Sequence, residues 1–214
     1  MKMTFFFALL TLLTALYSDE HPSAGWSVSK QAAPLSYSVE FFIKQEENTL
    51  SRVVRSGLFT PRYYYDVYNS NDNFVMRGIT RAFSLGLLFN WGIEMDLYDA
   101  SEQHVGMICG EFWSSSRAKF AFYDLNGRII AHAYLNDESC NFMLVSNENE
   151  KKPLAEFKGK VYGDASMWEM KPKSAPIHVE ESALYIFAAF ISDFQRSFIR
   201  PPKVIHHHHY NERE

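Results

Sequence analysis

The side chains that could carry chemistry are few and widely spaced. The motifs G-x-S-x-G, H-E-x-x-H and C-x-x-C are absent from the sequence, and so is a P-loop. Asp96 and Asp124 fall on or beside predicted strands, where carboxylates usually face solvent or bond a turn. His104 and His132 belong to successive predicted hairpins, but two histidines without a third ligand do not make a metal site. We therefore predict no catalytic residue, no metal ligand and no cofactor.

Four consecutive histidines, His206–His209, come after the last predicted element of the fold. Such a run binds transition metals when it belongs to a loose tail. We assign residues 201–214 to a polar, His-rich tail and expect no functional metal site in it.

The N-terminus has the features of a secretory signal. Lys2 precedes the apolar run "MTFFFALLTLLTALYS", which ends in the polar stretch "SDEHPS". A bilayer span needs about 20 apolar residues, so this run is short for a membrane anchor. We predict a signal peptide over residues 1–18 and export to a secreted, periplasmic or outer-surface location. A buried N-terminal helix and an uncleaved anchor are the alternatives.

Export would place Cys109 and Cys140 in an oxidising compartment, where two thiols can form a disulfide. Closing a loop of about 30 residues in this way would add roughly 3–4 kcal/mol in the chain-entropy model. The sequence does not show whether the two Cβ atoms approach each other, so a pair of buried free thiols is the equal alternative.

The composition predicts one globular domain rich in strands. The chain has 214 residues, of which 47% are hydrophobic and 21% are charged, with a net charge of −4. This length is sufficient for one sizeable core. A mild acidic excess speaks against a nucleic-acid binder, which usually has a basic face. The content of 18 Phe and 12 Tyr favours β-strands.

Short apolar runs alternate with turn residues after a flexible, polar lead-in over residues 19–36. They amount to about a dozen candidate strands at a spacing of about 8–14 residues, which is typical of an all-β sandwich or barrel. In "IEMDLYD", Met95 and Leu97 share one face of the strand, and Glu94 and Asp96 share the other. A period of two with one polar side indicates strands that are half buried against a core.

The turns between these runs repeat one composition. "YNSNDN", "YDASEQ", "YDLNG" and "SNENEKK" are all rich in Asn and Asp, which tolerate left-handed backbone and bond their own turn. We therefore predict a meander in which the same Asx-turn hairpin recurs.

The last predicted element, over residues 181–199, has helical propensity and is apolar on almost its whole circumference, and Pro201 and Pro202 end it. Such a helix is either buried or in a membrane, and its apolar run is too short to cross a bilayer. The side chains predicted to form this core helix are Leu184, Phe187, Phe190, Ile191 and Phe194. We predict a closed antiparallel β-barrel of about twelve strands over residues 37–200, with the helix running through it.

Several segments resemble the tubby C-terminal-like fold, and within it the LURP-one-related and phospholipid-scramblase-like branch. The matching segments, between residues 63 and 193, are "YDVYNSNDNFVMRGITRAFSL", "MDLYDASEQHVGMI", "FAFYDLNGRIIA" and "ESALYIFAAFISD". The resemblance implies a twelve-stranded barrel around a central C-terminal helix. It also implies an association with membranes, because tubby members bind phosphoinositides through a basic pocket and scramblase-like members are membrane-associated. This chain has no recognisable form of the basic pocket motif.

Two basic stretches, "SSSRAKF" and "ENEKKPLAEFKGK", are candidates for contacts with anionic lipid headgroups. Their basic side chains are Arg117, Lys119, Lys151, Lys152, Lys158 and Lys160. We predict a non-enzymatic exported barrel that binds membrane lipid or a protein partner, and no nucleic acid. The alternative is a lipocalin-like carrier of a small apolar ligand. A lipocalin keeps its helix outside the barrel and has an early Gly-x-Trp, a spacing that "AGWS" lacks.

Overall fold

Twelve strands and a C-terminal helical segment make up the described part of the chain. The computed structural model describes residues 25–32, 38–57, 62–111, 118–136, 141–148, 152–162, 165–174 and 177–198. The strands are β1 (Trp26–Ala32), β2 (Val39–Gln45), β3 (Asn48–Ser56), β4 (Tyr64–Asn69), β5 (Phe74–Thr80), β6 (Glu94–Asp99), β7 (His104–Gly110), β8 (Lys119–Asp124), β9 (Ile129–Asn136), β10 (Asn141–Ser146), β11 (Pro153–Tyr162) and β12 (Ala165–Pro172). The remaining elements are the 3-10 helices η1 (Leu85–Leu87) and η2 (Asn90–Gly92) and the α-helices α2 (Glu181–Asp193) and α3 (Gln195–Phe198).

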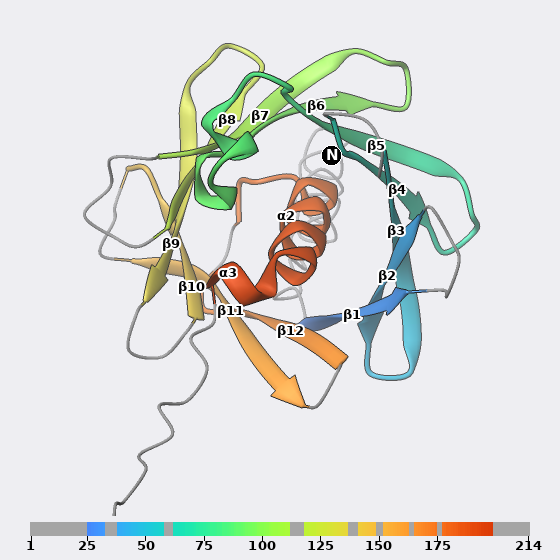
Figure 1. Ribbon diagram of the computed structural model, residues 1–214. Helices are drawn as coiled ribbons and strands as arrows, with labels where there is room; N and C mark the ends of the chain where they lie inside the picture. Colours follow the sequence, from blue (N-terminus) through green and yellow to red (C-terminus); the bar gives the residue numbers. More distant parts are fainter. Residues whose placement is uncertain are drawn as a thin grey trace, which may run out of the picture.

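The strands form a closed antiparallel barrel around helix α2, which confirms the predicted fold class (Figure 1). Each strand pairs with its neighbours in the sequence, and β1 pairs with β12 to close the ring. All residues of α2 from Ala183 to Ser192 are buried. No helix in the described ranges has the length and apolar character of a membrane span.

Three hairpins of the barrel use the predicted Asx turn. Asn69, Asp99 and Asp124 end β4, β6 and β8, and each Oδ1 accepts hydrogen bonds from two backbone N–H groups of its own turn. The donors are Asn71 and Asn73, Ser101 and Gln103, and Asn126 and Arg128, at distances from 2.8 to 3.0 Å. The residue three positions after each acceptor has positive φ, which is 62° for Asp72, 61° for Glu102 and 73° for Gly127. Asn and Asp therefore specify the turn through their side-chain oxygen.

The interior is filled with aromatic rings that pack edge to face. Phe187 of α2 lies 5.4 Å from Phe120 and from Phe122, and 5.5 Å from Phe142 and from Phe157, measured between ring centroids. Such pairs contribute beyond the area that they bury. Helix α2 therefore packs against barrel strands that are distant from one another in the sequence.

The predicted core-helix residues divide into four that lie in the interior and one at the mouth of the barrel. Leu184, Phe187, Phe190 and Ile191 have at most 2% of their surface exposed. Phe194 is only half-buried, because the helix ends there with φ −104° and ψ 28° and α3 follows. The predicted single helix over 181–199 is thus two helices, and residue 199 lies outside the described residues.

The barrel begins earlier than predicted, because strand β1, of seven residues, lies within the segment 19–36 that was predicted to be a flexible lead-in. Trp26 and Val28 point into the core, and Ser27 and Ser29 alternate with them on the outside. β1 is too short and too polar to be recognised alone, and it is a strand because β2 and β12 pair with both of its edges.

Because neighbouring strands are antiparallel, the connections of the barrel alternate between its two ends. The Asx turns lie at one end, which we call the turn end. Strands β1, β3, β5, β7, β9 and β11 end at the other end of the barrel, where α2 also ends and α3 lies. We call this the α3 end, and the 3-10 helices η1 and η2 of the β5–β6 connection belong to it.

Candidate functional site

The basic side chains predicted to bind headgroups do not form one cluster among the described residues. Lys119 begins β8 and pairs with Glu111, with 3.2 Å between Nζ and Oε2. Lys158 is exposed on β11. The strand register places β9 and β10 between these two lysines, so they are separated by roughly 14 Å across three strand spacings.

The other four predicted headgroup contacts are spread further. Lys152 is exposed just before β11, at the turn end of the barrel. Lys160 lies on β11 towards the α3 end, and only its backbone is described. Arg117 and Lys151 lie outside the described residues. A patch that contains all six side chains is therefore not part of the described structure.

The histidines considered for chemistry lie beside carboxylates in two separate pairs, and His132 is buried. His104 Nε2 lies 3.7 Å from Asp96 Oδ1, and His132 Nδ1 lies 3.2 Å from Glu111 Oε1. The described ranges contain no group of three His, Cys, Asp or Glu residues that could hold a metal ion. Asp124 serves its Asx turn, where the backbone N–H groups of the turn, that of Arg128 first, lower its pKa.

The Cys109–Cys140 disulfide, to which two free thiols are the equal alternative, stays a prediction. Cys109 lies on β7 with a free thiol, whereas Cys140 lies outside the described residues. Asn141, the next residue, begins β10, and β8 and β9 lie between β10 and β7. Three strand spacings are roughly 14 Å, and a disulfide needs Cα atoms within about 7 Å of each other. A disulfide between Cys109 and Cys140 would therefore have to span strands β8 and β9.

One connection of the barrel carries most of the exposed apolar surface. Five large apolar side chains are exposed among the described residues, and four of them belong to the β5–β6 connection. These four, which we call the apolar tip, are Phe83, Leu85, Leu88 and Phe89, with exposed fractions of 102%, 47%, 73% and 36%. A contiguous exposed apolar patch is typical of a binding surface. We therefore take the apolar tip and its supports as the candidate functional site.

The backbone beneath the apolar tip is hydrogen-bonded and closely packed. The N–H groups of Leu88 and Phe89 both donate to the Leu85 carbonyl oxygen, at 3.0 and 2.9 Å. Glycine is needed at position 86, because a Cβ there would come within 2.5 Å of the Ile93 Cα. Gly110 of β7 donates its N–H to the Ile93 carbonyl oxygen at 2.7 Å. The connection therefore has an ordered backbone with its own hydrogen bonds and close packing.

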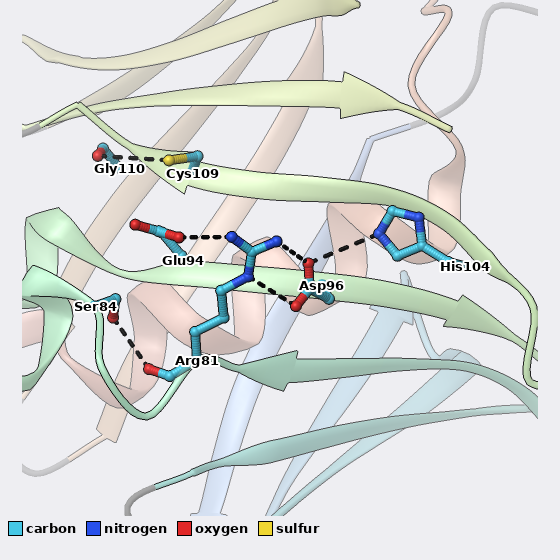
Figure 2. Close-up of polar contacts among 7 residues, drawn as sticks. All are labelled: Arg81, Ser84, Glu94, Asp96, His104, Cys109 and Gly110. Carbon is cyan, nitrogen blue, oxygen red and sulfur yellow. Dashed lines mark hydrogen bonds and ion pairs between the residues drawn. The ribbon is translucent and has the colours of Figure 1, made fainter. Parts of the chain in front are cut away.

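An arginine fixes the first residue of this connection to strand β6 (Figure 2). Arg81 makes two bonds to Asp96, with Nε–Oδ2 at 2.9 Å and Nη2–Oδ1 at 2.6 Å, and a third to Glu94 at 2.9 Å. These acidic partners, Asp96 first, raise the pKa of the guanidinium above its usual value. The Ser84 hydroxyl donates to the Arg81 carbonyl oxygen at 3.1 Å. Because a planar guanidinium binds a carboxylate in one orientation, Arg81 sets the direction in which the connection leaves the sheet.

A second contact joins the connection to the core helices. The Asn90 amide nitrogen donates to the Ser197 hydroxyl of α3 at 2.7 Å. Phe198 of α3 is itself buried against Phe120 and Phe142. The apolar tip is therefore held from β6, β7 and α3 and keeps its position relative to the barrel.

The sequence analysis did not single out this site. The signal was present in "RAFSLGLLFNWGI", where an apolar run without any acidic residue breaks the strand alternation and contains two glycines. Such a run between two half-buried strands has no sheet face to occupy. It is consequently a candidate for exposed apolar surface.

Comparison with known proteins found no relative: no protein-family model and no curated protein matches this chain. Function is therefore inferred from the geometry of the described residues.

Proposed function

We propose that this protein is a non-enzymatic β-barrel of the tubby and LURP-one-like type that binds membrane lipid with the α3 end of its barrel. The fold supports the family assignment, because a closed barrel of twelve strands around a C-terminal helix is what the resemblance implies. Lipid binding is supported by the apolar tip, which places four of the five large exposed apolar residues of the described ranges at one end of the barrel.

The packed interior directs binding to the outside of the barrel. A lipocalin-like carrier holds its ligand in the space within the strands, and here helix α2 occupies that space with buried residues from Ala183 to Ser192. The lipid therefore contacts the surface of the barrel. A protein partner at the apolar tip is the competing occupant.

Export remains part of the proposal, and residues 1–18 lie outside the described residues. The apolar run after Lys2 supports it, because its length suits a secretory signal. Intact mass of material released from the cell should correspond to a chain without residues 1–18. Released protein that still carries Met1 would refute the cleavage.

The test of lipid binding is sedimentation of the full chain with phosphatidylcholine vesicles, with and without phosphatidylserine. We expect the protein to sediment with both, and more strongly with the anionic vesicles. Lys158→Glu at the α3 end should weaken binding to the anionic vesicles about tenfold, since each basic residue near such a surface contributes about 1 kcal/mol. Lys152→Glu at the turn end is the matched control and should bind like wild type. Protein that stays in the supernatant with both kinds of vesicle would refute the proposal.

A further inference from the structure

We infer that the apolar tip enters the bilayer interface, so that this protein holds its membrane by hydrophobic insertion and recognises the uncharged interface of the lipid more than its headgroup charge. The inference rests on the proposed function and assigns the residues and the mode of binding. Phe83 and Leu88 are the penetrating side chains, and Leu85 and Phe89 form the base of the inserted surface.

The exposure of Phe83 is the first observation. The residue is 102% exposed, so none of the residues that the structure describes covers its ring. Leu88 is 73% exposed in the same connection. The transfer of apolar side chains of this size out of water is favourable. The core of the barrel is already filled by other residues. A bilayer interface accepts such side chains with no need for a shaped cavity.

The rigidity of the connection is the second observation. The turn bonds to Leu85, the three bonds of Arg81 and the bond from Asn90 to Ser197 hold the backbone in place before any binding occurs. Binding then orders few additional groups, which lowers its entropic cost. An insertion element benefits from this arrangement, because Phe83 and Leu88 are already exposed before any binding occurs.

The electrostatic character of the connection is the third observation. Residues 82–93 contain no charged side chain. At their start, Arg81 is bonded to two carboxylates, so its charge is offset within the protein. Insertion of a neutral surface depends little on ionic strength, because salt screens charges and leaves apolar transfer unaffected at ordinary concentrations.

The polar side chains of the connection favour a bilayer over a protein partner as the occupant. Ser84 donates to the Arg81 carbonyl oxygen, and Asn90 donates to Ser197. Both are used to build the connection, so residues 82–93 themselves supply little of a directional polar rim around the apolar tip. Protein interfaces usually have such a rim around an apolar centre, whereas a lipid interface does not require one. Trp91 stacks beside Phe89, with 5.0 Å between ring centroids, and adds an aromatic ring of the kind that lies at the membrane boundary.

The test compares substitutions of exposed apolar residues at the two ends of the barrel. Phe83→Ser and Leu88→Ser remove the penetrating side chains, and Leu125→Ser removes an apolar side chain, 65% exposed, at the turn end. We expect Phe83→Ser to lower the partition coefficient on phosphatidylcholine vesicles about tenfold and the double variant to lower it further. Leu125→Ser should partition like wild type. None of these four variants changes a buried side chain, so each protein should keep the melting temperature of wild type.

Two further measurements separate insertion from surface attraction. Wild type should remain bound to phosphatidylcholine vesicles when the salt concentration is raised to one that removes binding by charge alone. Phe83→Trp should lose fluorescence on vesicles whose acyl chains carry bromine, whereas Leu125→Trp should not show this additional quenching.

The outcomes distinguish this inference from the function on which it rests. Binding that salt abolishes and that Phe83→Ser leaves unchanged would overturn insertion and leave lipid binding by charge in place. Wild type that binds no vesicle would overturn the proposed function itself. A wild-type dimer in solution that Phe83→Ser converts to a monomer would show that a second copy covers the apolar tip, and this result too would overturn insertion.

Discussion

Asp193, the last residue of helix α2, places its carboxylate Oδ2 3.0 Å from the guanidinium Nε of Arg55 on strand β3. Lys30 of β1 binds the other carboxylate oxygen at 2.8 Å, and the hydroxyl of Tyr65 donates to Oδ2 at 3.4 Å. The side chains of Asp193 and Arg55 are 5% and 8% exposed. The two cations also face the C-terminal end of α2, where the helix dipole is negative. One carboxylate thus joins the core helix to strands β1, β3 and β4 of the barrel.

Replacing Asp193 should destabilise the protein strongly. Asp193→Ala leaves the guanidinium of Arg55 buried without its counter-charge, and breaking a buried pair in this way costs about 3–5 kcal/mol. Denaturant unfolding of wild type and variant measures the difference. Glu47→Ala, an exposed change at the turn end, is the control and should stay within about 0.5 kcal/mol of wild type. A cost below about 1 kcal/mol for Asp193→Ala would show that the ion pairs do not hold the helix.

Phe190 tests whether helix α2 fills the barrel. Its side chain is 1% exposed and lies 5.7 Å from Phe120, between ring centroids. Phe190→Ala should cost about 3–5 kcal/mol, because a cavity remains in the core. Phe190→Asp should prevent folding, since a carboxylate without a partner is very unfavourable in apolar surroundings. Circular dichroism and thermal melting measure both effects.

Leu125 supplies the control for Phe190, because it is apolar but exposed. Leu125→Asp should keep the folded spectrum and the melting temperature of wild type. If Phe190→Asp shifted the melting temperature by less than about 2 °C, the helix would not be part of the core.

The parts of this fold that could be predicted from the sequence are those with a local physical cause. Asn69, Asp99 and Asp124 specify their turns through hydrogen bonds to residues two and four positions later, so the hairpins are visible in short stretches. Helix α2 is apolar on all sides, and a short helix of that kind has to be surrounded by other elements. A closed sheet with a helix inside it follows from these two facts.

The parts that were missed depend on partners far away in the sequence. Strand β1 is held by β12, as Val28 pairs with Trp168, and a seven-residue stretch does not show this partner. Helix α2 ends at Asp193, where Lys30 and Arg55 bind the carboxylate. The apolar tip was missed for another reason, because apolar residues predict burial and Phe83 is exposed. Exposure in the β5–β6 connection results from the 3-10 turns and from the three bonds of Arg81.

Glu156 should make stability depend on pH in the acid range. Lys173 donates to its carboxylate at 2.8 Å and Asn141 at 2.6 Å, and Lys173 first, through its hydrogen bond, lowers the pKa of this carboxyl. A lowered pKa in the folded state contributes stability above the unfolded pKa of about 4.3, and this stability is lost as the pH falls through the folded value. At neutral pH, Glu156→Gln should therefore be less stable than wild type by about 1 kcal/mol.

The pH series on Glu156→Gln carries its own check. The difference in melting temperature between variant and wild type should be constant above the unfolded pKa and should shrink as the pH falls below it. A difference that stays constant through the acid range would mean that Glu156 does not have a lowered pKa. Glu47→Gln, which alters an exposed carboxyl, should show no such trend beyond the common acid response.

The thiols should both be free. The three strand spacings between β7 and β10 separate Cys109 from Asn141, the neighbour of Cys140. Burial, together with Glu94, raises the pKa of the Cys109 thiol, so it should react slowly with alkylating reagents in the folded protein. Thiol titration of unfolded, unreduced protein should find two thiols per chain. Finding none, with a lower melting temperature after reduction, would establish the bond.

The pairing of the first strand with the last has a consequence for biosynthesis. β1 can pair with β2 as soon as both have been made, but its other edge stays open until β12 has left the ribosome, and α2 follows β12 in the chain. Until then, core side chains on the inner faces of the nascent hairpins, such as those of Phe120, Phe142 and Phe157, stay exposed. Barrel closure therefore has to wait for β12, with long loops to close and a slow rate. During this interval the unfinished chain is a substrate for chaperones, and a chain truncated before residue 181 should remain bound to them.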